Sequence, residues 1–154
     1  MDNINVTPIG WVKGGRQEAT KDHWGDNLCS IALDNKQFSA EALFGLNEVS
    51  HIEVIFYFHL HADEKIEKAA RHPRGKKDWP KVGIFAQHGR MRPNRLGVSI
   101  CKVVSLEGTQ IVVAGLDAVD GTPILDIKPV WSGYLPCEDV REPEWAKEIM
   151  KQYW

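Results

Sequence analysis

Apolar residues along this chain recur mostly at the two-residue spacing of β-strands. The strongest run, residues 51–59, is rich in β-branched and aromatic side chains and too short for a membrane helix, so it predicts a buried central strand. Shorter runs predict further strands at residues 6–12, 28–33, 82–86, 97–106, 110–116 and 123–128. Pro8 indicates that the first strand lies at an edge or contains a bulge, and Gly108 marks a turn between two later strands.

Helical signals are few. Ser39 fits the N-cap of a helix of one or two turns, and Gly45 fits its C-terminal stop. Near the end of the chain, Trp145, Ile149 and Tyr153 lie four residues apart, a spacing that predicts a helix within residues 141–154.

Residues 63–80 lack an apolar pattern and include the sequence HPRGKKDWP, which predicts a long loop. Six or seven short strands with few helices indicate a mainly β protein whose antiparallel sheet is closed or nearly closed. The sequence contains no internal repeat and no linker. We therefore expect one domain over residues 1–154, with a barrel core at about 4–130 and a tail at 131–154.

The composition agrees with an ordinary globular protein, since 43% of the residues are hydrophobic and 26% are charged. No apolar run approaches the roughly 18 residues that span a bilayer, and the first residues lack the pattern of a secretory signal. Cys29, Cys101 and Cys137 are widely separated, which favours neither a disulfide framework nor a zinc ribbon. These features predict a cytoplasmic protein that is not associated with a membrane.

The charges are unevenly distributed. Residues 65–95 hold ten of the 19 Lys and Arg residues but only two acids, Glu67 and Asp78, although the whole chain has a net charge of −2. A basic segment within an acidic protein indicates a local anionic partner, such as nucleic acid. The alternative interpretation is a solvated, mobile loop.

Several familiar site motifs are missing: there is no GxGxxG, no GxxxxGK[ST] and no GxSxG. On a strand, His59 and His61 would point to the same face, as two ligands of one metal ion do, and His51 or Asp63 would supply a third ligand. Such pairs are common without metal, so we expect no metal site.

Two segments carry more specific chemistry. In residues 90–97, Pro93 and Gly97 fix a loop, while arginine and asparagine side chains supply donors suited to carboxylate or phosphate. Residues 117–129 place three carboxylates, those of Asp117, Asp120 and Asp126, at the ends of apolar runs. A rigid turn explains either segment equally well unless both face one pocket.

Together these segments resemble the TrmO/TsaA-like family of S-adenosylmethionine-dependent tRNA methyltransferases. The resemblance runs through most of the chain, in the blocks Pro8-Ile9-Gly10, Gly45-Leu46, Ser50-His51, Phe56 to His59, Gly83 to Ala86, Arg92-Pro93-Asn94, Gly97, Ser99, Asp117 to Pro123 and Leu125 to Pro129. It implies a small single-sheeted β-barrel with short helices and a C-terminal helix. It also implies a homodimer with the cofactor in a cleft near the subunit interface, and the apolar Trp131, Tyr134 and Leu135 fit an interface.

The resemblance also implies the site residues. S-adenosylmethionine would be held by Asp22, His23, Trp24, His59, Leu60, His88, Arg92, Val98, Leu116, Val119, Asp120, Gly121 and Thr122. On charge grounds, Arg92 or His88 is the candidate for the cofactor's carboxylate. Asp120 and His59 are the candidate catalytic bases. Candidate contacts to the tRNA are Arg74, Lys76, Lys77, Asn94 and Arg95, and Trp79 would either stack on a base or pack on the barrel.

The reaction implied is methylation of the exocyclic nitrogen of threonylcarbamoyladenosine beside the tRNA anticodon. The chain departs from the family in having His88 where an arginine often stands, and only about 25 residues follow Pro129, where long members carry a further domain. Two alternatives therefore stay open: a module or sensor that binds S-adenosylmethionine without methylating tRNA, and a methyltransferase for a small molecule.

Overall fold

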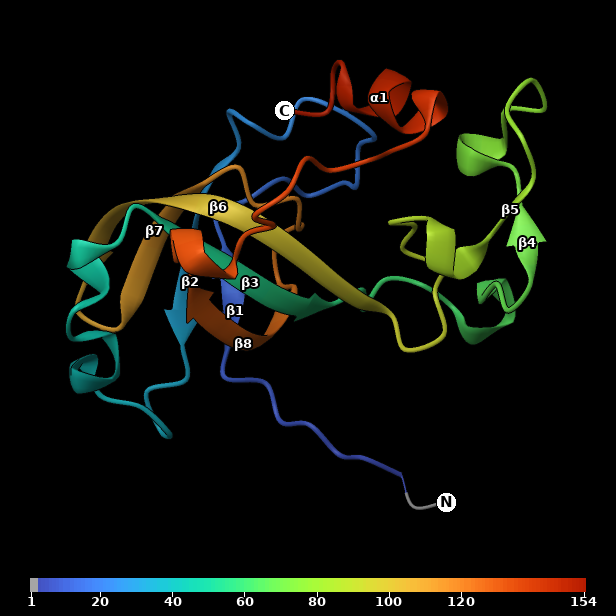
Figure 1. Cartoon of the computed structure of the whole chain (residues 1–154). Coiled ribbons are helices and arrows are strands. Elements are labelled where there is room, and N and C mark those ends of the chain that lie inside the picture. Colours follow the sequence, from blue (N-terminus) through green and yellow to red (C-terminus); the bar gives the residue numbers. More distant parts are fainter. Residues whose placement is uncertain (1–2) are drawn as a thin grey trace.

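The structure is a computed structural model that describes residues 3–154, and its centre is a closed six-stranded barrel (Figure 1). Around the barrel the strand order is β1-β2-β7-β6-β3-β8, and β8 pairs with β1 to close the sheet. The barrel strands are β1 (Gly10–Lys13), β2 (Leu28–Leu33), β3 (His51–Tyr57), β6 (Leu96–Glu107), β7 (Gln110–Ala114) and β8 (Pro123–Pro129). Every pairing is antiparallel, as the sequence predicts.

Apolar side chains at alternate positions of the strands fill the interior of the barrel. Along β3, Ile52, Val54 and Phe56 are buried while the residues between them are only partly so, and their neighbours in the core come from β1, β2, β7 and β8. Since one face of each strand is buried, a slip of one residue would expose this whole set, and the register is therefore strongly specified. The predicted mainly β barrel is confirmed.

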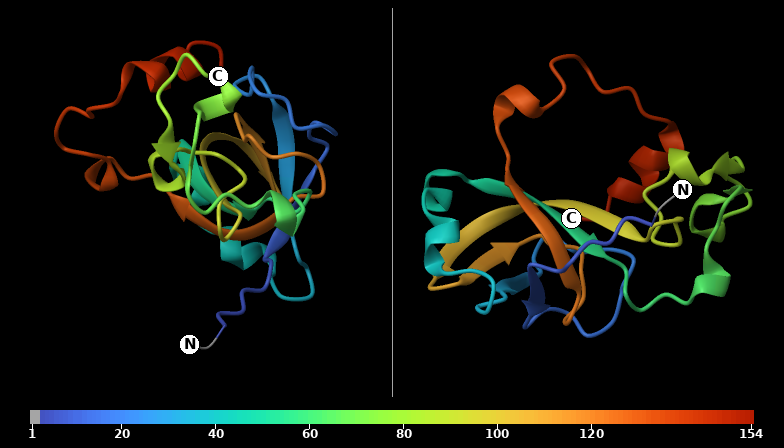
Figure 2. Two further views of the ribbon diagram at one scale, coloured as in Figure 1. Left: turned by 90° about the vertical axis from the view of Figure 1, so that its right-hand side faces the viewer. Right: turned by 90° about the horizontal axis from the view of Figure 1, so that it is seen from below.

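A lobe made of residues 58–95 extends beyond one end of the barrel, and the left view of Figure 2 shows it in front of the barrel opening. Its sheet has only two short strands, β4 (Ala70–Arg71) and β5 (Val82–Gly83). The predicted strand over residues 82–86 is wrong beyond Gly83, because Ile84–Ala86 form a 3₁₀ turn. Burial does not alternate there: Ile84 is 1% exposed and Phe85 is 81% exposed. The basic segment of the sequence, residues 65–95, lies entirely within this lobe, and β6 begins directly after it.

The remaining elements are short. Ser39 caps a 3₁₀ turn at Ala40–Leu43 by accepting a hydrogen bond from the Glu41 N–H, as the sequence predicts. The C-terminal helix α1 covers only Glu144–Met150, so Tyr153 lies beyond it. Figure 1 shows α1 and the end of the chain beside the loop that follows β1. Within residues 3–154, no helix has the length and apolar character needed to cross a membrane.

The cysteines are free thiols, as the absence of a disulfide framework predicts. Cys29 and Cys101 lie in the core, where burial raises the pKa of Cys29 to about 11 and that of Cys101 to about 12. Both stay protonated at neutral pH and act as small apolar side chains.

Gly97 provides a test of barrel packing. A Cβ at this position would overlap the ring of Phe56, which faces it on the paired strand β3. We expect Gly97→Ala to lower the free energy of unfolding by about 1–3 kcal/mol, the usual cost of overpacking a core. Gly83→Ala is the control, because a Cβ there meets no atom within 4 Å. Equal midpoints for the two variants in urea denaturation would contradict this packing.

Candidate functional site

Two loops at one end of the barrel are joined by hydrogen bonds of both backbone and side-chain groups. One loop, residues 14–27, joins β1 to β2, and the other, residues 115–122, joins β7 to β8. The Gly14 N–H donates to Asp120 Oδ1 at 2.9 Å, and the Asp120 N–H donates to the Arg16 carbonyl at 2.8 Å. At the other end of the loops, the buried Asn27 amide donates to the Leu116 carbonyl at 2.8 Å. The chain thus brings together two segments that lie about a hundred residues apart.

The first loop is shaped by Arg16. Its guanidinium lies 4.6 Å from the centre of the Trp24 ring and donates to Thr20 Oγ1 at 2.5 Å, to the Asp22 carbonyl at 3.0 Å and to the His23 carbonyl. Trp24 is buried, and His23 adopts a left-handed conformation with φ 63°. These contacts fix three of the predicted cofactor residues, Asp22, His23 and Trp24, in one compact turn.

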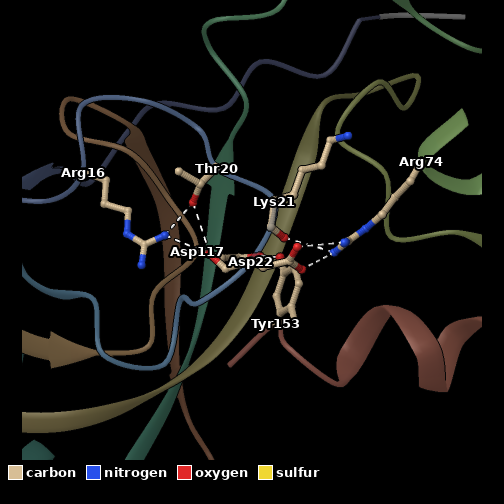
Figure 3. A network of polar contacts seen from close by, with 7 residues as sticks. All are labelled: Arg16, Thr20, Lys21, Asp22, Arg74, Asp117 and Tyr153. Atoms are coloured by element: carbon tan, nitrogen blue, oxygen red, sulfur yellow. Dashed lines mark hydrogen bonds and ion pairs between the residues drawn. The ribbon is translucent and has the colours of Figure 1, made fainter.

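Arg74 joins this loop to the lobe, as Figure 3 shows. Its guanidinium makes a bidentate ion pair with Asp22, at 2.6 and 3.0 Å, and also donates to the Lys21 carbonyl at 3.1 Å. The hydrogen bond and charge of Arg74 hold the pKa of Asp22 below its usual value. A predicted tRNA contact and a predicted cofactor residue therefore form one pair.

Asp117 is the polar centre of the site. Ser99, which is buried on β6, donates its hydroxyl to one carboxylate oxygen, and Tyr153 from the C-terminal segment donates to the other. Burial, followed by the charge of Asp117, raises the pKa of the Tyr153 hydroxyl, which keeps its proton and remains a donor. Sequence reasoning placed Asp117 in a functional segment but assigned it no role, and it missed Tyr153 because helical spacing explained that residue.

Other predicted cofactor residues surround this centre unevenly. Leu116, Val119 and Thr122 are buried beneath Asp117, and Gly121 makes its turn with φ 75°. Val98 is 53% exposed on β6, next to Ser99. His59 and Leu60 follow the end of β3, and His88 lies exposed in the lobe. Arg92 donates to the Gln87 carbonyl at 3.0 Å, and within residues 3–154 no hydrogen bond or ion pair links Arg92 or His88 to the two loops.

The predicted tRNA contacts divide into two groups. Besides Arg74, Arg95 is occupied inside the protein: it pairs with Asp63 and donates to the His61 carbonyl at 2.7 Å. Lys76, Lys77 and Asn94 are exposed, although Lys76 lies 4.4 Å from the centre of the Trp79 ring. Over residues 3–154, Arg74 and Arg95 are the basic residues of segment 65–95 that have a carboxylate within 4.0 Å.

Arg71 is unusual among the remaining cations. Its Nη1 reaches only the Met91 sulfur, at 3.3 Å, and its Nε is buried without a hydrogen-bond partner in the described part of the chain. A thioether is a weak acceptor, so this guanidinium lacks the strong acceptors that its donors require. Among residues 3–154, its Nε is therefore an unpaired buried donor in the lobe.

Two cavities lie away from these loops. The larger, of about 580 Å³, is lined mainly by apolar residues that include Phe38, Phe44 and Trp131. The other, of about 340 Å³, shares Trp131 and adds Tyr134 and Leu135. Among residues 3–154, no group of three or more His, Cys, Asp or Glu side chains is arranged to hold a metal ion.

Comparisons with known proteins agree with this arrangement. Residues 17–136 match the family model for the tRNA-methyltransferase O N-terminal domain. The chain is 34% identical to human tRNA (adenine(37)-N6)-methyltransferase over 92% of its length and 33% of the relative's. It is 39% identical to the putative S-adenosylmethionine-dependent methyltransferase RcsF of Pseudomonas aeruginosa, over 88% of this chain and 58% of the relative.

A solved structure, TrmO from Pseudomonas aeruginosa, superposes with a TM-score of 0.72 at 27% identity, covering 91% of this chain and 62% of that one. The chain thus spans about a third of the human relative and less than two thirds of these bacterial proteins. The family model covers residues 17–27 of the first loop, the whole of the second loop with Asp117, and the basic lobe. This chain belongs to the family of tRNA-methyltransferase O N-terminal domains.

Proposed function

We propose that this protein binds S-adenosylmethionine between loops 14–27 and 115–122 and transfers its methyl group to tRNA. The observation that carries the proposal is that loop 14–27 is hydrogen-bonded to Leu116 and Asp120, on either side of Asp117, in a chain whose relatives are named as methyltransferases or S-adenosylmethionine-binding proteins. The loops contain eight of the thirteen predicted cofactor residues.

The residues present fit the charges of this cofactor. Its sulfonium and ammonium groups are cations, and the half-buried Asp117 carboxylate offers them a partner close to the loop backbone. Its carboxylate needs a cation, and our candidate is Arg71, whose Nε has no hydrogen-bond partner among residues 3–154, while Arg92 already donates to the Gln87 carbonyl. His88, which stands where the family often has arginine, is a weaker donor.

When bound, the cofactor supplies an already activated methyl group. The protein's task is to align the acceptor nitrogen and exclude water. A base is needed only for the proton of that nitrogen, and Asp120 and His59 are our candidates. The Asp120 carboxylate also holds the Gly14 N–H, so it orders the loop as well.

We assign the basic lobe to the tRNA backbone. Eight of its ten Lys and Arg residues have no carboxylate within 4.0 Å among residues 3–154, and such a concentration of unpaired cations attracts phosphates. The acceptor we propose is the exocyclic nitrogen of threonylcarbamoyladenosine beside the anticodon. The name of the human relative, which specifies adenine 37 and N6, supports this choice.

We further propose that the protein is a homodimer. On the outward face of β6, Val98, Ile100 and Val104 are about half exposed and form an apolar stripe that Lys102 interrupts between the last two. Ile100 lines the same cavity as Trp131, Tyr134 and Leu135, which extends the stripe beyond β6. We propose that a second copy covers these side chains, because exposed apolar patches of this kind often mark interfaces.

Cofactor binding and methyl transfer test the central proposal. Isothermal titration calorimetry with S-adenosylmethionine and a chelator should give saturable binding. Asp117→Asn should weaken it about tenfold, the usual effect of losing a charge-assisted hydrogen bond. Asp126→Asn is the control, since Asp126 accepts a hydrogen bond from the adjacent Ile127 N–H. Absence of binding by the unaltered protein, or a requirement for zinc, would contradict the proposal.

Methyl transfer is measured by incubating the protein with labelled cofactor and total tRNA, followed by nucleoside analysis. We expect label in methylated threonylcarbamoyladenosine. Cofactor binding with no label in any nucleoside would favour a sensor, and label in a small molecule would favour the other alternative.

The lobe is tested with the double variant Lys76→Ala, Lys77→Ala, which leaves the Asp22–Arg74 pair intact. If both side chains contact phosphates, tRNA affinity should fall, and the slope of log affinity against log salt should become shallower by roughly one per lost contact. Cofactor affinity should not change. Arg74→Ala is the contrasting variant and should weaken cofactor binding through the freed Asp22. An unchanged salt slope in the double variant would exclude these lysines as phosphate contacts.

Light scattering coupled to size-exclusion chromatography tests the homodimer. The protein should have twice the mass of a 17.4 kDa chain, and Val98→Lys should shift it toward the monomer by placing a charge in the apolar stripe. A monomeric mass at high micromolar concentration would refute the dimer.

A further inference from the structure

The C-terminal segment Gln152–Trp154 lies against the candidate cofactor loop through its backbone. The His23 N–H donates to the Gln152 carbonyl at 2.8 Å, and the Trp24 N–H donates to the Tyr153 carbonyl at 2.7 Å. These are consecutive amides of the loop and consecutive carbonyls of the tail. The left-handed conformation of His23 turns both N–H groups toward the tail, so this contact does not depend on side chains.

The loop is shaped to accept this segment. A Cβ on Gly25 would lie 2.8 Å from the Trp154 carbonyl carbon and 3.3 Å from its Cα, so a side chain at position 25 would push the segment away. His23 adopts φ 63°, which is uncommon for a residue other than glycine. The backbone of residues 23–25 thus matches the segment that covers it.

Tyr153 connects the loop to Asp117, because it bonds both of them. Its hydroxyl donates to Asp117 (Figure 3). Its backbone carbonyl accepts from the Trp24 N–H, and the other oxygen of Asp117 accepts from Ser99. One oxygen of the carboxylate is therefore fixed by the barrel and the other by the tail. Removing the Tyr153 hydroxyl would leave the Asp117 carboxylate held by Ser99 alone.

Few other contacts hold the tail. Every residue from 131 to 144 is exposed, and α1 contributes no buried residue. The segment is thus held mainly by the contacts of residues 152–154, and local opening needs little free energy when so few contacts must break. It also lies outside residues 17–136, the part that matches the family model.

We propose that Tyr153 is a positioning residue of the cofactor site and that the segment Gln152–Trp154 closes over the site when the cofactor binds. This inference rests on the proposed function. The cofactor's cations meet an Asp117 carboxylate that Tyr153 has already oriented, and the closed segment keeps loop residues 22–24 in their binding conformation. Docking of the segment and binding of the cofactor then strengthen each other by the same factor.

Tyr153→Phe tests the role of the hydroxyl, because it keeps the ring and both backbone hydrogen bonds. Calorimetry should show S-adenosylmethionine bound about tenfold more weakly than by the unaltered protein, as expected for a hydrogen bond to a charged group. Tyr57→Phe is the matched control, since the Tyr57 hydroxyl makes no hydrogen bond within residues 3–154 and the variant keeps the ring that lies 5.3 Å from the Arg95 guanidinium. Its affinity should equal that of the unaltered protein.

Amide hydrogen exchange provides a readout that does not depend on activity. In the unaltered protein, saturating S-adenosylmethionine should slow exchange at His23 and Trp24 about tenfold, by the reciprocity of the coupling. Tyr153→Phe should lose most of this response, and both amides should also exchange somewhat faster without cofactor, because one of the few contacts that hold the segment is gone. Gly25→Ala is the second variant: it should raise exchange at both amides without cofactor and weaken cofactor binding, although Tyr153 and Asp117 are unchanged.

The outcomes separate the competing accounts. Unchanged cofactor affinity in Tyr153→Phe would show that the hydroxyl is only structural and would overturn the inference. Tighter binding in either variant would also overturn it, since the segment would then compete with the cofactor. If the unaltered protein bound no cofactor, the proposed function itself would fall, and this inference with it.

Discussion

The half-buried carboxylate of Asp117 is the constraint on which the site depends. A carboxylate removed from water must find hydrogen-bond donors, because leaving one unsatisfied costs about 1–3 kcal/mol or more. Here the donors are Ser99 from the barrel and Tyr153 from the tail. The hydrogen bonds of this one carboxylate thus hold three segments together: the loop after β7, the strand β6 and the end of the chain.

A second ion pair extends this arrangement into the basic lobe. Asp22 belongs to the loop that the tail covers, and its partner Arg74 belongs to the lobe that we assign to tRNA. The cofactor region and the RNA region are therefore mechanically joined, although each has its own chemistry. Arg74 has a structural task, so exposed lysines such as Lys77 are better candidates for phosphate contacts than Arg74 itself.

The barrel was predictable because its signal is local. Alternating burial along β3 and the β-branched residues of β7 specify strands without any knowledge of their neighbours. The lobe was harder to predict, because its residues resemble those of a strand without packing as one. In residues 82–86 only the Ile84 side chain is buried, and Val82 is half buried. Its conformation comes instead from the buried Gln87 amide, which donates to the Val82 carbonyl at 2.8 Å.

The site was only partly predictable. The resemblance pointed to loops 22–24 and 116–122, which the structure brings together, yet no pattern linked Asp117 to Tyr153, 36 residues away. Likewise, sequence counts Arg74 and Arg95 as free cations, and only the fold reveals the acids Asp22 and Asp63 beside them. Long-range partners of this kind leave no signal in a single sequence.

A crystal structure of the protein with S-adenosylhomocysteine tests the central claim most directly. Our account predicts that the ligand lies between loops 14–27 and 115–122, with Asp117 within hydrogen-bonding distance of it and Tyr153 still donating to Asp117. Ligand bound elsewhere, for example in the apolar cavity beside Trp131, with the two loops unoccupied, would contradict the account.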